Sequence, residues 1–182
     1  MSFLLYGCQI VEPEYTINDS AIAELTVSYK NFKQLKKDAT IIAEVEVIGQ
    51  KTIIHSDMPF TISKVKILST KKGNVSHEET INIIETGGEY KPLGKENEEL
   101  PEVKMSLNGV RPMIVGEHLF LFLEPFVGPQ IEGAYIPLGA YQGKFQLKDN
   151  KVKQLSSEEY FLPEFAGDKE VPLEDFNKML MD

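Results

Sequence analysis

The chain has 182 residues, a formal net charge of −9 and a single arginine, Arg111. A surface of this sign repels nucleic acid and anionic lipid, and one arginine gives little means of bidentate phosphate or guanine recognition. The single cysteine, Cys8, excludes an intramolecular disulfide, and no stretch reaches the roughly 20 apolar residues of a transmembrane helix. We therefore expect one domain with its own hydrophobic core and no nucleic-acid partner.

The first residues form a short apolar run that ends in Leu5-Tyr-Gly-Cys8. This ending resembles a bacterial lipoprotein signal, in which a cysteine is acylated through its sulfur and becomes the mature N-terminus. The run is shorter than the roughly 7–15 apolar residues of an export signal, so we expect the full gene to encode more residues upstream. Residues 1–8 are interpreted as the remnant of this signal and residues 9–25 as a polar tether. The alternative is a frayed N-terminus with an incidental thiol.

A helix is predicted before the first strand. Residues 26–38 are amphipathic, with lysines between apolar residues three positions apart, and Thr26 or Ser28 is suited to cap the N-terminus. The apolar face is expected to lie in the core and consists of Tyr29, Phe32 and Leu35.

Two strands follow, at residues 40–49 and 60–68, separated by a ten-residue connection. Both runs are rich in β-branched residues and alternate between apolar and polar side chains. In the second run the apolar positions change from even to odd between Ile62 and Val65, which predicts a β-bulge. A bulge bends and coils a strand, and this helps a small sheet close into a barrel.

Further strands are predicted at 79–85, 113–123 and 135–138, followed by a hairpin over 144–155 that turns at Asp149-Asn150. Residues 113–123 are apolar on both faces, so this strand needs a cover on each side, and the first helix is the nearest candidate. Residues 172–181 have the pattern of a C-terminal amphipathic helix.

The segment between 87 and 116 is long, highly charged and without a period, so we expect a mobile loop.

These elements predict a mainly β, OB-fold-like closed barrel of five or six strands over residues 26–182, with a helix before the first strand and another at the C-terminus. A β-sandwich is the alternative. The barrel requires Phe60 and Val65 to face one interior. The side chains expected in that interior are Val45, Ile62, Val65, Ile83 and Leu121.

Four patterns together resemble a known barrel: Ala39-x-Ile-Ile-Ala-Glu-Val-x-Val, Phe60-x-Ile-x-x-Val-Lys-Ile-Leu, Ile81-x-Ile and Val115-Gly-Glu-x-Leu-x-Leu-Phe-Leu123. They are similar to the tissue inhibitors of metalloproteinases (TIMP) and netrin-like modules. They look even more like an uncharacterised group of secreted or lipid-anchored proteins of Gram-positive bacteria. The resemblance covers residues 26–155. Inhibitor activity does not carry over, because the inhibitors' N-terminal cysteine docks on the protease zinc and is pinned by disulfides, which Cys8 cannot form.

Three classes of function stay open: a lipid-anchored binding module of the cell surface, a protease-inhibitor-like protein and a metal-dependent hydrolase. The binding module is favoured, without a cofactor. His55, His77 and His118 lack metal-type spacing. The neighbouring acids in His77-Glu78 and Glu117-His118 are expected on the opposite face of an extended chain.

Small barrels fill their interior with side chains, so the ligand is expected to bind outside, at strand faces and rim loops. The loop at 87–116 combines apolar residues with the only arginine, which suits a protein, peptide or glycan partner. The predicted interaction surface consists of Tyr90, Met105, Leu107, Arg111, Met113, Tyr135 and Tyr141.

Overall fold

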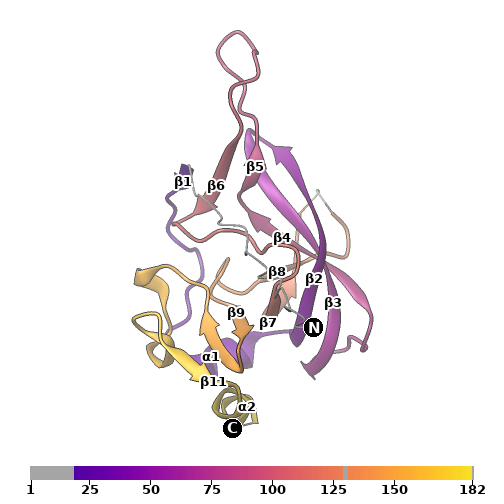
Figure 1. Cartoon of the computed structure of the whole chain (residues 1–182), viewed down its shortest axis with the longest axis vertical. Helices are drawn as coiled ribbons and strands as arrows, with labels where there is room; N and C mark the ends of the chain where they lie inside the picture. Colours follow the sequence, from indigo (N-terminus) through magenta and orange to yellow (C-terminus); the bar gives the residue numbers. More distant parts are fainter. Residues whose placement is uncertain (1–18, 129–130, 182) are drawn as a thin grey trace, which may run out of the picture.

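The computed structural model describes residues 19–128 and 131–181 (Figure 1). This part of the chain is mainly β, with two α-helices near one end of the molecule. None of its helices has the length and apolarity needed to cross a bilayer. Cys8 lies outside the described residues, so the predicted lipidation stays a prediction.

The first helix, α1 (Phe32–Asp38), is shorter than predicted. Asn31 is its N-cap, and its side chain accepts a hydrogen bond from the N–H of Gln34 (2.8 Å). The predicted cap at Thr26 or Ser28 is therefore wrong. Tyr29 precedes the helix and is nevertheless buried with the apolar face, as predicted.

The strands β2 (Ile41–His55) and β3 (Met58–Lys72) form one long antiparallel hairpin. Its turn is only two residues long, Ser56 and Asp57, and both have positive φ (49° and 60°), as a type I′ turn requires. The predicted ten-residue connection is therefore wrong, because most of it continues the two strands.

The predicted bulge between Ile62 and Val65 is also wrong. The register of β3 with β4 (Thr80–Thr86) runs without interruption through this stretch. Ile62 is buried on the opposite face from Val65 and lies beside Ile84 of β4. The change of apolar positions from even to odd therefore arises because both faces of β3 are covered in this stretch. The β2–β3 ladder is irregular at three points. Ile48 is left over in β2, opposite Lys64 and Val65, and Leu68 and Lys71 are left over in β3.

The main sheet has eight strands in the order β11-β10-β9-β7-β2-β3-β4-β8. Because β7 also pairs with β8, five of these strands (β7, β2, β3, β4 and β8) form a partial ring. The parallel contact between β4 and β8 is a single pair, Ile83 with Tyr135. The remaining bounds are β7 (His118–Pro125), β8 (Tyr135–Pro137), β9 (Lys144–Lys148), β10 (Lys151–Gln154) and β11 (Glu170–Pro172).

One hydrophobic cluster fills the ring. It contains Val45, Val65, Ile83 and Leu121, which confirms four of the five predicted core residues there. Ile62 is buried but lies outside this cluster. Phe60 is half-buried and is two residues from Ile62 on the strand, so it does not share the interior face of Val65.

A second cluster covers the outer face of β7, which is buried on both sides as predicted. The ring of Phe32 in α1 lies 5.3 Å from that of Phe122, which confirms the first helix as a cover. The C-terminal helix α2 (Leu173–Met181) adds Phe176, 4.9 Å from Phe120. Burying a side chain of this size contributes about 1.5–3 kcal/mol.

The C-terminal part of the chain supplies about half of the second cluster. The β9–β10 hairpin turns at Asp149-Asn150, as predicted, with both residues at positive φ. Two short 3-10 helices follow, η1 (Glu158–Tyr160) and η2 (Pro163–Phe165), and Phe165 of η2 packs 5.0 Å from Phe145 of β9.

A second, three-stranded sheet corrects the prediction of a mobile loop at 87–116. Here β5 (Gly88–Tyr90) and β6 (Val103–Leu107) form an antiparallel hairpin whose tip projects from one end of the molecule (Figure 1). On the other side, β6 pairs in parallel with β1 (Asp19–Ala21). The last part of the predicted 9–25 tether therefore contains a strand.

Candidate functional site

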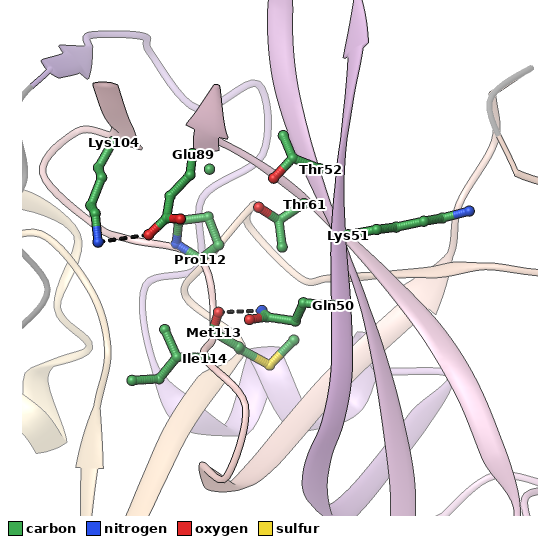
Figure 2. Close-up of a pocket in the computed structure, with 10 residues that line it drawn as sticks. Gln50, Lys51, Thr52, Thr61, Glu89, Lys104, Pro112, Met113 and Ile114 are labelled. Atoms are coloured by element: carbon green, nitrogen blue, oxygen red, sulfur yellow. Dashed lines mark hydrogen bonds and ion pairs between the residues drawn. The ribbon is translucent and has the colours of Figure 1, made fainter. Parts of the chain in front are cut away.

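A groove of about 320 Å³ lies between the distal half of the β2–β3 hairpin and the β5–β6 hairpin (Figure 2). Three parts of the chain supply its walls. The lining includes Gln50, Thr52 and Thr61 from β2 and β3, Gly88, Glu89 and Lys104 from β5 and β6, and the segment 112–114.

Glycines bring β5 close to the β2–β3 hairpin. The N–H of Gly87 donates to the carbonyl of Pro59 (2.9 Å), and the hydroxyl of Thr61 donates to the carbonyl of Gly87 (2.8 Å). Gly88 has φ +135°, and a Cβ there would overlap the hydroxyl oxygen of Thr61. Only glycine allows the backbone to pass at this distance and conformation. The sequence signal was the Gly-Gly pair after the third predicted strand.

The inside of the groove has little net charge. Glu89 and Lys104 form an ion pair across β5 and β6 (2.6 Å), and the side chain of Lys51 points away from the groove in Figure 2. Hydroxyl and amide groups of β2 and β3 therefore face the apolar side chains of Met113 and Ile114. Such a surface suits an uncharged ligand group.

A buried ion pair fixes one wall of the groove. The ammonium group of Lys144 lies 2.7 Å from a carboxylate oxygen of Glu85 and also donates to the carbonyl of Arg111 (2.8 Å). The second oxygen of Glu85 accepts the N–H of Met113 (2.9 Å). These bonds hold the groove wall at 112–114 against β4 and β9. Sequence reasoning missed the pair, because two charged residues in separate strands give no local signal.

The same wall is held by a second ion pair. Arg111 donates to both carboxylate oxygens of Glu117, and Glu117 also accepts the N–H of Ile114 (2.8 Å) and the amide of Gln146 (3.1 Å). In addition, the side-chain amide of Gln50 donates to the carbonyl of Met113. The guanidinium predicted to bind a partner is therefore engaged in holding the segment 111–117.

The structure scatters the predicted interaction surface. Met105, Met113 and Tyr141 are buried, which corrects their assignment to an exposed surface. The Tyr141 hydroxyl accepts a hydrogen bond from the side-chain amide of Asn108 and shares another with the hydroxyl of Ser157 (3.0 Å each), so it is satisfied internally.

The other predicted members also differ in position. Tyr135 is half-buried and packs against the cluster inside the ring. Tyr90 and Leu107 are half-buried on β5 and β6. Two exposed apolar side chains of residues 87–116 lie at the hairpin tip, where Leu93 is 63% and Leu100 is 39% exposed. Sequence reasoning missed them because it assigned no hairpin there.

His118 lies beside an acid. Its Nε2 is 3.1 Å from a carboxylate oxygen of Glu44, without the alignment of a hydrogen bond, and Ser69 donates to the other oxygen (2.9 Å). Nucleophilic catalysis places the imidazole between the hydroxyl and the acid, so that it can take the hydroxyl proton. Here the carboxylate lies between the other two groups, which is the wrong order for that chemistry.

His77 contacts its neighbour Glu78 (3.4 Å), although the sequence predicted opposite faces. The reason is the positive φ of Glu78 (65°), which replaces extended chain by a turn. The prediction holds for Glu117 and His118, which contact different partners. Within residues 19–128 and 131–181, no three or more histidine, cysteine or acidic side chains converge as metal ligands do.

No protein-family model, curated protein or solved structure matches this chain. The resemblance to the TIMP and netrin-like barrel and to Gram-positive surface proteins therefore stays a prediction.

Proposed function

We propose that the chain is a binding module held at the outer face of a bacterial membrane by a lipid on Cys8, and that it captures a protein, peptide or glycan partner through the groove and the β5–β6 hairpin. The observation that carries the proposal is the groove. Its walls are fixed by the Lys144–Glu85 and Arg111–Glu117 ion pairs, so the surface is formed before a partner arrives.

We further propose that the five-stranded ring is an OB-fold-like barrel of the TIMP and netrin-like type. Its strands follow one another in the order β2, β3, β4, β8 and β7, with β4 and β8 parallel. Barrels of this size are filled by side chains and bind their ligands on outer strand faces and rim loops. The β5–β6 hairpin projects from one end of the molecule (Figure 1), and the groove lies between it and the β2–β3 hairpin, which supports a binding surface at the rim of the proposed barrel.

The hairpin tip gives this surface both its acidic charge and its exposed apolar side chains. Residues 91–102 include two lysines and four glutamates, with two exposed leucines, Leu93 and Leu100, among them. Lys91 pairs with Glu99 (3.2 Å), which leaves a surplus of acids around the leucines. A partner with an apolar patch bordered by basic residues complements this tip.

Shortening the hairpin tests the binding role. Removing all of 87–116 would delete the buried Met105 and Met113, so the replacement is limited to residues 91–102. Tyr90 pairs with Val103, and an Asn-Gly turn in place of 91–102 closes the hairpin at that pair. We expect an unchanged circular dichroism spectrum and loss of the partners that the full chain captures from native membranes.

A control variant keeps the hairpin backbone and changes only its leucines, Leu93→Glu with Leu100→Glu, and should lose the same partners. Capture of identical partners by the shortened chain contradicts a binding role of the hairpin.

The membrane anchor is tested separately. Mass spectrometry of protein extracted from membranes should show a diacylglyceryl adduct on Cys8, and Cys8→Ala should release the chain. Two acyl chains on one residue are enough for stable anchoring. An unmodified Cys8 in membrane-bound protein contradicts this part of the proposal.

A further inference from the structure

The strand β2 has an open edge beside the groove. It pairs with β7 only over Ile41–Glu46, whereas its pairing with β3 continues to His55. The segment before β7 then turns away, as the N–H of Glu117 donates to the carbonyl of Ile114 (3.1 Å). Among the residues that the structure describes, no strand pairs with the second side of residues 49–55. At about 3.4 Å per residue, this edge is roughly 24 Å long.

The backbone N–H and C=O groups of β2 point out of this edge at every second residue. The carbonyl of Pro59 points away from β2, because it accepts the N–H of Gly87 (2.9 Å). Pro59 lies opposite Ile54, and both members of such an antiparallel pair direct their peptide groups away from each other. In steps of two residues, the N–H and C=O groups of Ile54, Thr52 and Gln50 therefore face outward.

The surroundings of the edge favour an added strand. Ile48 and Ile54 on β2 and Val115 next to it are exposed apolar side chains. Natural sheet edges are usually protected by charged residues, prolines or a covering segment. Between residues 49 and 54 the only charged side chain is Lys51, and it points away from the groove (Figure 2).

We propose that an extended peptide segment of a partner protein adds as a strand to the open edge of β2 at residues 49–55 and places an uncharged, apolar side chain in the groove. Backbone hydrogen bonds to Gln50, Thr52 and Ile54 supply affinity, and the groove supplies selectivity. This inference rests on the proposed binding function and names the class of partner.

Size and charge favour a peptide over a second copy of the chain. The groove, at about 320 Å³, is at the lower end of ligand sites and takes one or two side chains. Two copies, each with a net charge of −9, repel one another. The acidic hairpin tip nearby instead favours a peptide with lysine or arginine at its ends.

The test uses random heptapeptides displayed on phage and selected on the immobilised full chain, followed by fluorescence anisotropy with the enriched peptides. We expect apolar residues at alternate positions. Thr52→Pro removes an outward N–H at an edge position that tolerates proline and should raise Kd by about tenfold, the effect of one lost hydrogen bond. Thr52→Val keeps that N–H and loses only the side-chain hydroxyl, so it should bind the peptides more tightly than Thr52→Pro.

A second measurement does not depend on the folding of a variant. Peptides N-methylated at alternate nitrogens keep their side chains but lose strand pairing, so they should bind wild-type protein about tenfold more weakly. Equal binding of the methylated peptides, or no enriched peptide at all, overturns the inference. A dimer seen by sedimentation that disappears in Thr52→Pro also overturns it, because it assigns the edge to a second copy.

The outcome is separable from that of the proposed function. If Thr52→Pro still captures the membrane partners while the chain shortened at 91–102 does not, the strand-addition inference fails and the binding function stands.

Discussion

The ammonium group of Lys144 and the carboxylate of Glu85 lie 2.7 Å apart, with 1% and 4% of their side chains exposed. Both groups project to the interior side of the sheet, since Lys144 lies opposite Leu121 and Glu85 is two residues from Ile83. The ring is thus apolar in its middle and ionic at the end that carries the groove. The free-energy cost of removing the two charged groups from water offsets their mutual attraction. The pair therefore contributes more to the position of the segment 112–114 than to stability.

Breaking this pair should destabilise the protein strongly. Lys144→Met leaves the buried Glu85 carboxylate with the Met113 N–H as its remaining bonded partner. We expect the free energy of unfolding in urea to fall by about 3–5 kcal/mol. The double variant Lys144→Met with Glu85→Gln removes the uncompensated charge, keeps an acceptor for Met113 and should recover most of the loss. If the single variant loses less than about 1 kcal/mol, water compensates the charge and the site is not closed.

Gly88 should tolerate no side chain, whereas Gly109 should tolerate one at the usual cost of its backbone conformation. Both have positive φ, but a Cβ on Gly88 meets Thr61 and Thr52 while nothing lies within 4 Å of a Cβ on Gly109. The difference between Gly88→Ala and Gly109→Ala in thermal unfolding therefore reports the close approach of β5 to the β2–β3 hairpin together with the rarer backbone conformation of Gly88 (φ +135° against +77°). We expect Gly88→Ala to be less stable by about 1–3 kcal/mol. Equal stabilities contradict the tight contact.

Much of the fold follows from local pattern. Alternation located the strands around Val45, Ile83 and Leu121, and the two apolar faces of β7 correctly predicted a cover on each side. The turn at Asp149-Asn150 was predicted because both residue types tolerate positive φ. These features are determined by residues that are close together in the sequence, so they can be recognised from the sequence alone.

The candidate site depended on contacts that the sequence does not display. The turn at Ser56-Asp57 has no glycine, so the distal half of the β2–β3 hairpin was interpreted as a connection. Lys144 and Glu85 come together only through the sheet order, and β6 is held between β5 and β1 by pairings that no periodicity marks. Met105 and Met113 consequently were placed on a loop surface when they are buried.

Relieving the backbone strain in the β2–β3 turn should stabilise the protein. Ser56 and Asp57 adopt left-handed conformations that Asn-Gly adopts at lower cost. The double variant Ser56→Asn with Asp57→Gly should gain about 0.5–1 kcal/mol, or roughly 1–4 °C in Tm. Differential scanning calorimetry measures this gain. A lower Tm would show that the added freedom of glycine in the unfolded chain outweighs the relief of strain.

Tyr29 should make the protein sensitive to alkali. Its burial, together with Glu124 and Asp38, raises the pKa of the phenol above its ordinary value in the folded chain. A raised folded-state pKa gives stability that is fully present below the unfolded value of about 10 and is lost as pH rises through the folded value. Tyr29→Phe removes this titration, so its free energy of unfolding should fall less than that of wild type between pH 8 and pH 11. Urea unfolding at both pH values measures the difference. Parallel losses in the two proteins would show that the Tyr29 phenol titrates alike in the folded and unfolded chains.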